Sequence, residues 1–412
     1  MNGAAPSEPI DEPSELAAFR HRCAAFLDEH ATGDGLDAED PRGEIGLGIA
    51  RRFQALVAEA GLAGIAMDPT WGGLGLGPDY EKVWREEVAR RPLMTRQLAI
   101  SHGMCMPMLA EYGTDHQKSL YLAKVLRAEE VWCQLFSEPG AGSDVASLGT
   151  RAVRDGDEWI LNGQKVWTTL AHLCDRGIIV ARTNPSAVKH AGISMFIVDM
   201  KAPGVEIRPI HQIDGGRRFN EIFFTDVRIP ADHLIPPEND GWRLATAMLM
   251  YERVAIGTGQ ASGVMHERAD QLIRAARRRE IHHDPVIRQE LMTLYSREVC
   301  QSLTSILTRA RLQAGQTPGP GGSLGKLAGS YIGQLYRDLS LRIQGVASMA
   351  WNPDSGGDRW ALASLATLSG RIAGGTDEIQ KNIIGDRVLG LPREPALDRD
   401  VPFNELSTGS RP

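Results

Sequence analysis

Apolar residues recur at intervals of three and four along the first part of the chain, which is the spacing of amphipathic helices. This spacing predicts four helices, at residues 14–29, 46–60, 79–90 and 116–128. The second ends before Gly61, a residue type that favours the position just after a helix. We therefore expect residues 1–130 to form a helical domain.

The pattern changes near Val131, where short stretches rich in β-branched and aromatic residues replace the helical spacing. Asn162-Gly163 separates the stretches 158–161 and 164–169, and an Asn-Gly pair in such a place predicts the turn of a β-hairpin. Further strands are expected at 177–182, 193–198, 205–209 and 221–229. Residues 131–236 are thus predicted to form an antiparallel β-barrel or sandwich domain.

Helical spacing returns after Gly241 and predicts long helices at 242–277, 285–314, 324–350 and 359–369. A Gly- and Pro-rich break at 316–323 separates the second from the third. Long amphipathic helices without interior breakers favour a C-terminal four-helix bundle over residues 237–395, followed by a tail at 396–412. The predicted fold class is α+β multidomain, with helices, then strands, then helices.

Composition narrows the possible functions. A chain of 412 residues is long enough for two or three domains. Its net charge is −7, so we expect no nucleic-acid partner, because binding to phosphates needs a basic surface. Its five cysteines lie far apart without a Cys-x-x-Cys pair, so we expect no metal site and a reducing, cytoplasmic environment. No signal peptide and no membrane-spanning run are recognised.

A glycine-rich stretch at 136–144 reads Phe-Ser-Glu-Pro-Gly-Ala-Gly-Ser-Asp. Gly140 and Gly142 allow the backbone to turn tightly and to approach a ligand closely. The loop's N–H groups, with the hydroxyls of Ser137 and Ser143, can hold phosphate or ring oxygens. Taken alone, such a loop is more often an ordinary surface turn.

Two further stretches give this loop a context. Residues 162–169 read Asn-Gly-Gln-Lys-Val-Trp-Thr-Thr, in which Trp167 offers a flat apolar surface and Thr169 a hydroxyl. Residues 372–380 read Ile-Ala-Gly-Gly-Thr-Asp-Glu-Ile-Gln. At this spacing the three stretches resemble the acyl-CoA dehydrogenase family, and residues 382–392 are similar to the form found in its actinobacterial branch. The resemblance extends from the first helix to Pro392.

The resemblance implies bound FAD and an acyl-CoA substrate. It assigns the flavin and its ribityl chain to one group of residues: Gln134, Leu135, Phe136, Ser137, Gly142, Ser143, Trp167, Thr168 and Thr169. It assigns Thr376 and Glu378 to the adenine half, and Arg278 to the pyrophosphate of a neighbouring subunit's FAD. Substrate contacts are implied for Ser143, Arg253 and Gly375.

Dehydrogenation of a thioester needs a carboxylate that removes the proton next to the carbonyl. Many family members carry this Glu just before Gly-Thr, where this chain has Gly374. A subgroup resembling isovaleryl-CoA dehydrogenase carries it on the long helix after the β domain, where this chain has Glu252-Arg253. We therefore expect Glu252 to be the base, the alternative being a helix-surface acid. Gly374 keeps a backbone N–H, which could hold the thioester oxygen.

The resemblance weakens around Arg278, because the Phe-Gly that the family places three residues later is absent. A homodimer or homotetramer and a heterotetramer with a related chain both stay open. The electron acceptor is expected to be an electron-transfer flavoprotein or a similar carrier. Alternatives are a non-catalytic half-site subunit of a heteromer, or a flavin oxidase or monooxygenase of the same fold. The acyl group could be short, branched, long-chain or a steroid side chain.

Overall fold

A computed structural model describes residues 13–33, 43–91, 93, 96–257, 267–313, 321–349, 357–395 and 400–406, with the side chains of 96, 252–257, 267, 309, 312, 313, 321 and 357–359 excepted. Contacts divide the chain into two compact units. The first contains Met1–Gln97 and Leu126–Glu129, and the second contains Leu98–Val125 and Glu130–Pro412. Within the described residues, no helix is long and apolar enough to span a membrane.

The first unit is helical, as the apolar spacing predicts. Its helices are α1 (Ser14–His30), α2 (Glu44–Glu59) and α3 (Pro78–Ala89). Gly61 follows α2 with a left-handed backbone (φ +62°), the conformation expected of a glycine after a helix. Glu87 of α3 is buried and accepts hydrogen bonds from Arg20 of α1 at 3.1 Å and from Arg91 at 3.0 Å, so a buried charge joins these two helices.

Short helices open the second unit before its sheet begins. A five-residue π-helical turn, Ser101–Cys105, leads into α4 (Met106–Tyr112), and α5 (Asp115–Leu126) confirms the predicted helix at 116–128. The π-helical turn and α4 both pack against α6 (Gly241–Gly257). Such turns are frequent at functional sites, and this one borders the helix that carries Glu252.

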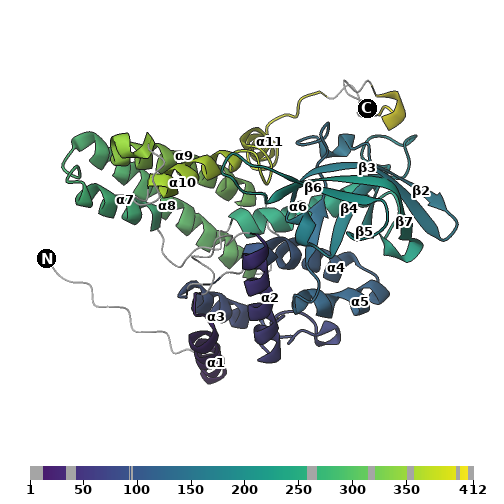
Figure 1. Ribbon diagram of the computed structural model, residues 1–412, viewed down its shortest axis with the longest axis horizontal. Coiled ribbons are helices and arrows are strands. Elements are labelled where there is room, and N and C mark those ends of the chain that lie inside the picture. The colour runs from purple at the N-terminus through teal and green to yellow at the C-terminus, as the bar shows by residue number, and fades with distance from the viewer. Residues whose placement is uncertain are drawn as a thin grey trace. The chain divides into compact units, whose positions relative to one another are not determined.

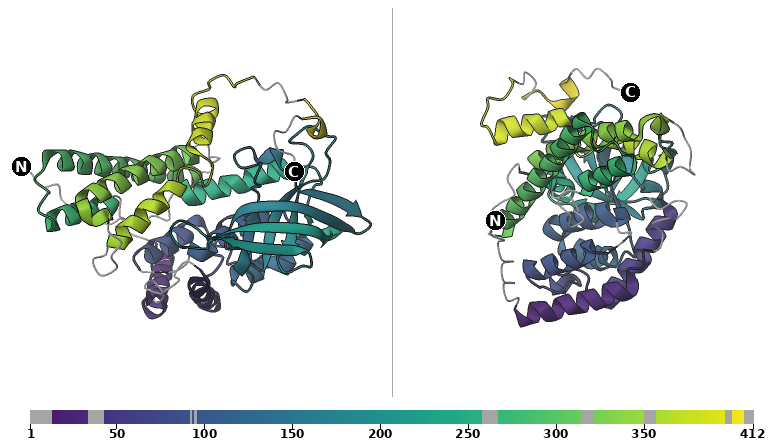
Figure 2. Two further views of the ribbon diagram at one scale, coloured as in Figure 1. Left: turned by 45° about the horizontal axis from the view of Figure 1, so that its top comes forward. Right: turned by 90° about the vertical axis from the view of Figure 1, so that its left-hand side faces the viewer.

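The second unit contains one mixed sheet, which lies to one side of the helices α7–α10, within residues 267–369 (Figures 1 and 2). Its strands run in the order β6-β7-β3-β2-β4-β5-β8, and β1 pairs with β4. They are β1 (Trp132–Leu135), β2 (Arg151–Asp155), β3 (Glu158–Thr169), β4 (Arg176–Arg182), β5 (Ile193–Asp199), β6 (Val205–Ile210), β7 (Phe219–Pro230) and β8 (Leu234–Ile235). The β region is confirmed, but the sheet is not wholly antiparallel, because β1 and β2 each pair with β4 in parallel.

The hairpin predicted at Asn162-Gly163 is wrong, since β3 continues through both residues. The pairing of β3 with β7 shifts register between Leu161 and Gly163, so the Asn-Gly pair forms a bulge. The Asn162 amide donates to the Asp226 carboxylate at 3.0 Å and its oxygen accepts from the Asp226 N–H at 3.0 Å. Asn162 thus pins the bulge on β7, and the hairpin turn lies earlier, at Gly156 between β2 and β3.

Helices follow the sheet, as predicted. They are α6, α7 (Glu267–Arg278), α8 (Pro285–Gln313), α9 (Gly321–Gln344), α10 (Gly357–Ser369) and α11 (Asp377–Arg387). Apolar side chains of α7, α8 and α9, including Leu272, Leu294 and Ile332, form a buried core. The predicted helix 242–277 is seen as α6 and α7, with 258–266 between them outside the described residues.

The helix predicted at 324–350 ends early. Gly345 adopts a left-handed backbone (φ +58°) that α9 cannot continue, and a short 3-10 turn follows over Gly345–Met349. Most of the predicted break at 316–323 lies outside the described residues, and Gly321 already belongs to α9. The predicted class, helices, then a β region, then a helical bundle, is confirmed.

Replacement of Gly163 by Ala is expected to destabilise the second unit. Its φ of +149° disfavours a side chain, and an added Cβ would lie 2.4 Å from the Thr150 hydroxyl oxygen. Strain and overlap together should cost about 3 kcal/mol in the free energy of unfolding, measured by urea denaturation. Gly156→Ala is the control, because a Cβ there meets nothing within 4 Å and only its left-handed φ costs about 1 kcal/mol. Equal losses would show that the bulge tolerates a side chain.

Candidate functional site

The loop that follows β1 holds a tight turn. The N–H of Glu138 donates to the carbonyl of Ala141 at 3.1 Å, and the Ala141 N–H donates to the Glu138 carbonyl at 3.0 Å. Beyond this turn Gly142 and Ser143 are exposed, and a Cβ added at Gly142 would meet nothing within 4 Å. The backbone here is therefore open to a ligand, and a glycine keeps its N–H groups uncovered.

Glu138, in the middle of this loop, forms a buried ion pair with Lys165 of β3. The Lys165 ammonium lies 2.8 Å from the Glu138 carboxylate and also donates to the Phe136 carbonyl at 3.0 Å. The other donors to Glu138 are the N–H groups of Gly149 at 2.6 Å and Thr150 at 3.0 Å. The Glu138 carboxylate thus joins its own loop to residues 149 and 150 and to the neighbouring strand β3.

The charge state of this pair follows from its surroundings. Burial, the largest effect, would raise the pKa of Glu138, but the Lys165 ammonium and the two N–H donors outweigh it and lower the pKa overall. Burial lowers the pKa of Lys165, and the attraction of Glu138 only partly offsets this. The Glu138 carboxylate is therefore ionised, and its attraction favours the protonated, charged form of Lys165.

The end of β3 presents an exposed indole. Trp167 adopts φ +63° at a register shift between β3 and β7, and 59% of its surface is accessible. Its ring packs edge-on against Phe219, with the centroids 6.1 Å apart. A left-handed Trp is unusual, and such strain is retained where the orientation of the side chain serves a purpose.

Two threonines follow Trp167 at the end of β3. Thr168 is buried, and its hydroxyl has no hydrogen-bond partner among the described residues. Its carbonyl accepts from the buried Asn220 amide at 2.9 Å. Thr169 is partly exposed opposite Phe219. The exposed indole beside the partly exposed Thr169 and the open backbone of the 136–144 loop fits a flat, heteroatom-rich ring such as a flavin.

The structure brings the two sequence motifs together. The Val166 N–H donates to the Ser137 carbonyl at 2.9 Å, so the loop and the end of β3 lie side by side. Leu135 and Phe136 are buried, which leaves their backbone, and not their side chains, for a ligand. Gln134 is partly exposed on β1. The sequence motifs contain Glu138 and Lys165, but the ion pair between them was missed, because only tertiary structure shows that Lys165 is buried and that Glu138 lies beside it.

The C-terminal signature lies elsewhere in the second unit. Thr376 caps α11 by accepting from the Ile379 N–H at 3.2 Å, while Glu378 is exposed. Asp377 fixes this end of α11 on α9 through the Ser330 hydroxyl at 3.0 Å. Among the described residues no hydrogen bond or ion pair joins this signature to the loop or to Trp167.

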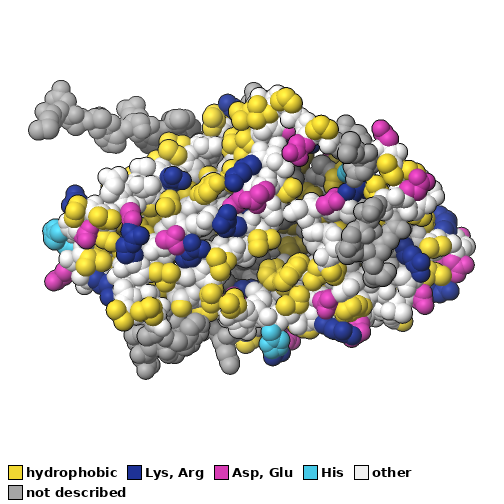
Figure 3. Space-filling view, turned by 90° about the horizontal axis from the view of Figure 1, so that it is seen from above, with side chains coloured by type: hydrophobic (Ala, Val, Ile, Leu, Met, Phe, Trp, Pro, Cys, Tyr) yellow, Lys and Arg dark blue, Asp and Glu magenta, His cyan; other side chains and the backbone are white. Residues whose placement is uncertain are grey.

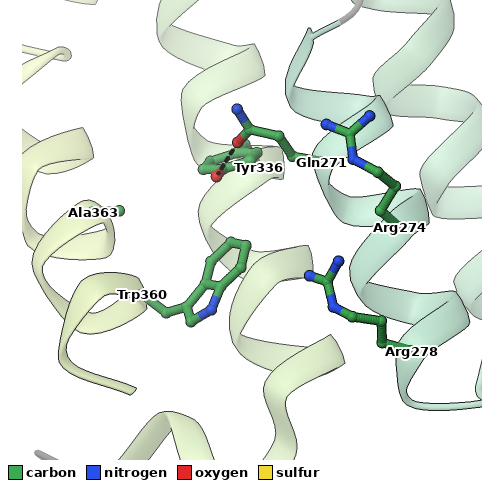
Figure 4. A pocket seen from close by; sticks show the side chains of 6 residues that line it. All are labelled: Gln271, Arg274, Arg278, Tyr336, Trp360 and Ala363. Carbon is green, nitrogen blue, oxygen red and sulfur yellow. Dashed lines mark hydrogen bonds between the residues drawn. The ribbon is translucent and has the colours of Figure 1, made fainter. Parts of the chain in front are cut away.

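Arg278 lies at the end of α7 beside a pocket of about 260 Å³. Arg274, one helical turn earlier, points into the same pocket, and the rings of Tyr336 and Trp360 form its opposite side (Figure 4). The Tyr336 hydroxyl donates to the Gln271 amide oxygen at 3.2 Å. Two guanidinium groups on one face make this pocket suitable for an anion. The described part of the chain holds no cluster of His, Cys, Asp and Glu suited to a metal.

Glu252 and Arg253 lie on α6, and their side chains are outside the described residues. The preceding residue, Tyr251, donates its hydroxyl to the Glu111 carboxylate of α4. Burial, followed by Glu111, raises the pKa of Tyr251, so this hydroxyl stays protonated. The bond ties α6 to α4 one residue before the predicted base.

A mixed sheet, preceded and followed along the chain by helices, that presents an exposed indole beside a glycine-rich loop is typical of a flavin-dependent oxidoreductase. Sequence profiles make the class specific. Those of the N-terminal, middle and C-terminal domains of acyl-CoA dehydrogenase match residues 13–129, 133–227 and 239–389. The chain belongs to the acyl-CoA dehydrogenase family, whose cofactor is FAD.

Individual relatives agree with this assignment. Acyl-CoA dehydrogenase IpdE1 of Mycobacterium tuberculosis is 38% identical over 344 residues, which are 84% of this chain and 88% of the relative. Among solved structures, the Tcur3481-Tcur3483 steroid acyl-CoA dehydrogenase superposes with a TM-score of 0.78 at 28% identity, over 93% of this chain and 99% of that one. The ChsE4-ChsE5 complex of Mycobacterium tuberculosis gives 0.75 at 27% identity, over 93% and 100%.

Lys165→Met is expected to lower the free energy of unfolding by about 3–5 kcal/mol, because it leaves the Glu138 carboxylate buried without its cation. Lys201→Met is the matched control, since Lys201 pairs with Asp175 at 2.9 Å but has 75% of its side chain exposed, against 0% for Lys165. The control should lose less than about 1 kcal/mol. Urea denaturation measures both variants, and similar losses would contradict a special role for the buried pair.

The same pair predicts a dependence on pH. Because the pKa of Glu138 is lowered in the folded protein, its carboxylate stabilises the fold above the unfolded value of about 4.3, and this contribution is lost as the pH falls. The difference in unfolding free energy between the wild type and Glu138→Gln should therefore be larger at neutral pH than at acidic pH. A difference that stays constant between these conditions would rule this linkage out.

Proposed function

We propose that this chain is an FAD-dependent acyl-CoA dehydrogenase that introduces an α,β double bond into an acyl-CoA thioester. Glu252 would remove the proton from the α carbon. FAD, held by the residues named below, would supply the acceptor for the hydride of the β carbon, and an electron-transfer flavoprotein or a similar carrier would take up the electrons. We further propose three domains, at 1–130, 131–236 and 237–395, with a tail at 396–412.

The observation that carries the flavin assignment is the exposed, left-handed Trp167 beside the open 136–144 loop. Residues on this loop and on the end of β3 would hold the flavin and its ribityl chain, as the sequence implies: Gln134, Leu135, Phe136, Ser137, Gly142, Ser143, Trp167, Thr168 and Thr169. The uncovered backbone at Gly142 supports this role, because no side chain blocks a ligand from its N–H groups.

The base assignment rests on helix geometry. Helical spacing places position 252 on the same face of α6 as Ala245 and Met248, which are both buried. A carboxylate on an apolar, desolvated face is a stronger base than one in water. The bond between Tyr251 and Glu111 supports the proposal further, since it fixes α6 next to position 252. Arg253 would order the substrate or the base, and Ser143 and Gly375 would contact the thioester.

A role in a larger assembly is supported by the surface of the helices after the sheet. Large apolar side chains are exposed there, among them Val346, Met349, Ile372 and Leu389. Figure 3 shows hydrophobic side chains spread among charged ones on the face seen from above. Such a surface favours contact with a second copy or with a related chain. The ChsE4-ChsE5 structure, a complex of two components by its name, supports the second alternative.

Arg278 would then reach the pyrophosphate of an FAD bound in a neighbouring subunit, and Thr376 and Glu378 would approach the adenine half. Arg274 strengthens this part of the proposal, because it brings a second guanidinium to the pocket beside Arg278. The cytoplasmic location expected from the sequence stays a prediction.

Anaerobic mixing with acyl-CoA thioesters tests the activity. The purified holoenzyme, alone or with its partner chain, should lose its flavin absorbance with at least one short, branched, long-chain or steroid thioester. Glu252→Gln should keep its FAD and be bleached at least about 1,000-fold more slowly, because no other base is in place. Bleaching of this variant at the wild-type rate would sink the assignment of the base. A chain that binds no flavin alone or with any partner would be a structural subunit.

A further inference from the structure

The chain departs twice from extended geometry at the end of β3. Trp167 has a φ of +63° and Leu170 a φ of +52°, and neither residue is a glycine. Residues with a side chain seldom take this left-handed conformation. The two threonines between them, Thr168 and Thr169, are therefore enclosed by unusual backbone that other parts of the protein have to hold in place.

The register of the sheet shows what the left-handed Trp167 does. Lys165 pairs with Ile222 and Thr168 pairs with Asn220, so three steps along β3 match two steps along β7. One extra residue is inserted between these pairs, which is a β-bulge. Side chains alternate between the two faces of a strand, and a slip by one residue moves each of them to the opposite face. The bulge thus decides that Thr168 is buried while Trp167 is exposed.

Asn220 of β7 holds the first paired residue after this bulge. It lies directly opposite Thr168, none of its surface is exposed, and its amide nitrogen donates to the Thr168 carbonyl at 2.9 Å. Because the peptide bond is planar, fixing this carbonyl also fixes the peptide that joins Thr168 to Thr169. The hydrogen bond therefore opposes a slip of β3 by one residue.

His172 in turn holds Asn220. It belongs to the 3-10 turn Ala171–Leu173 that follows β3, and its Nδ1 lies 2.9 Å from the Asn220 amide oxygen. The Thr168 carbonyl can only accept a hydrogen bond, so the Asn220 nitrogen faces it and the Asn220 oxygen faces the imidazole. The Nδ1 of His172 is then the donor. Two hydrogen bonds in series lead from the exposed His172 through Asn220 to the backbone of β3.

The second left-handed residue is held by the residue just before β7. The Leu170 N–H donates to the Arg218 carbonyl at 2.7 Å. Any residue at position 218 could supply that carbonyl, whereas the bond to Thr168 needs the amide side chain of Asn220. Asparagine is depleted in strands, and a fully buried strand position ordinarily favours an apolar residue. The amide at position 220 is therefore the part of this support that depends on residue type.

We propose that Asn220 is a positioning residue of the flavin site, which keeps Trp167 and Thr169 on the side of β3 that faces the cofactor, and that His172 holds the Asn220 amide in the orientation this requires. The inference rests on the proposed contact of Trp167 and Thr169 with FAD. Asn220 acts through the Thr168 carbonyl, so its effect on the flavin is carried by the backbone of β3.

Asn220→Leu tests this role in the holoenzyme, purified alone or with its partner chain. Leucine has a similar volume but cannot donate to the Thr168 carbonyl, so the bulge loses its side-chain support. The Kd for FAD should rise about 10- to 100-fold, because a buried carbonyl loses its donor and Trp167 loses its fixed place. The absorption bands of the flavin that stays bound should shift, since they depend on the surroundings of its ring.

Gln117→Met is the matched control. Gln117 has 1% of its surface exposed, and its amide nitrogen donates to the carbonyls of Asp232 at 2.6 Å and Leu234 at 2.9 Å. This variant also replaces a buried amide that holds backbone by an apolar side chain of similar size. It should lower the free energy of unfolding and leave the Kd for FAD and the flavin spectrum unchanged.

His172→Phe is a second variant, at an exposed position that folding does not depend on. It removes the donor to the Asn220 oxygen and should raise the Kd for FAD about 2- to 10-fold, in the same direction as Asn220→Leu. If Asn220→Leu does not fold, His172→Phe decides, and an unchanged Kd and flavin spectrum in it overturn the proposal.

Hydrogen exchange of residues 166–170 reports the backbone directly. Their amides should exchange faster in Asn220→Leu than in the wild type, and at the wild-type rate in Gln117→Met. Faster exchange with an unchanged Kd and flavin spectrum makes Asn220 a residue of the fold alone and contradicts the positioning role. An equal loss of FAD from Gln117→Met contradicts it as well. A wild type that binds no flavin, alone or with any partner, overturns the flavin site itself, which is distinguishable from a yellow wild type with indifferent variants.

Discussion

The buried ion pair of Glu138 and Lys165 is the interaction on which the β part of the site depends. A carboxylate taken out of water is costly unless cations and N–H groups surround it, and here Lys165, Gly149 and Thr150 all do so at 2.6–3.0 Å. Because its donors come from both sides of the loop and from β3, this one group fixes the loop backbone relative to Trp167. The open glycines and the exposed indole keep their places because Glu138 is held between them.

Departures from regular secondary structure carry the candidate chemistry. Trp167 takes a left-handed backbone at the end of a long strand, Gly163 makes a bulge within it, and Gly374 and Gly375 interrupt the path into α11. Buried polar groups on a regular neighbour support two of these departures, through Asn220 on β7 and Gln380 on α11, and the hydrogen bonds between Asn162 and Asp226 support the bulge. An unusual backbone conformation persists where its surroundings over-determine it.

Glycine at position 374 has a consequence for the whole helical part of the second unit. Because position 374 carries no carboxylate, the base that we propose, Glu252, comes from another element, α6. In that proposal proton removal depends on α6, and contacts with the thioester depend on the turn before α11. Their relative placement is set by contacts of α6 with α9 and of α11 with α9, so α9 is the shared support.

The sequence by itself determined the order of elements, because the apolar spacing of a helix or strand is a local pattern that can be recognised within a short stretch of residues. It also determined the family, through motifs whose residue types suit a flavin. It failed at Asn162-Gly163, where pairing with Asp226 turned a hairpin signal into a bulge, and at Gly345, which ended α9 early. Only the tertiary structure decided that Glu138 meets Lys165 and that Gln380 donates to the carbonyls of Gly374 and Gly375. Hydrogen bonds of this kind depend on register and burial between separate segments, which no local pattern encodes.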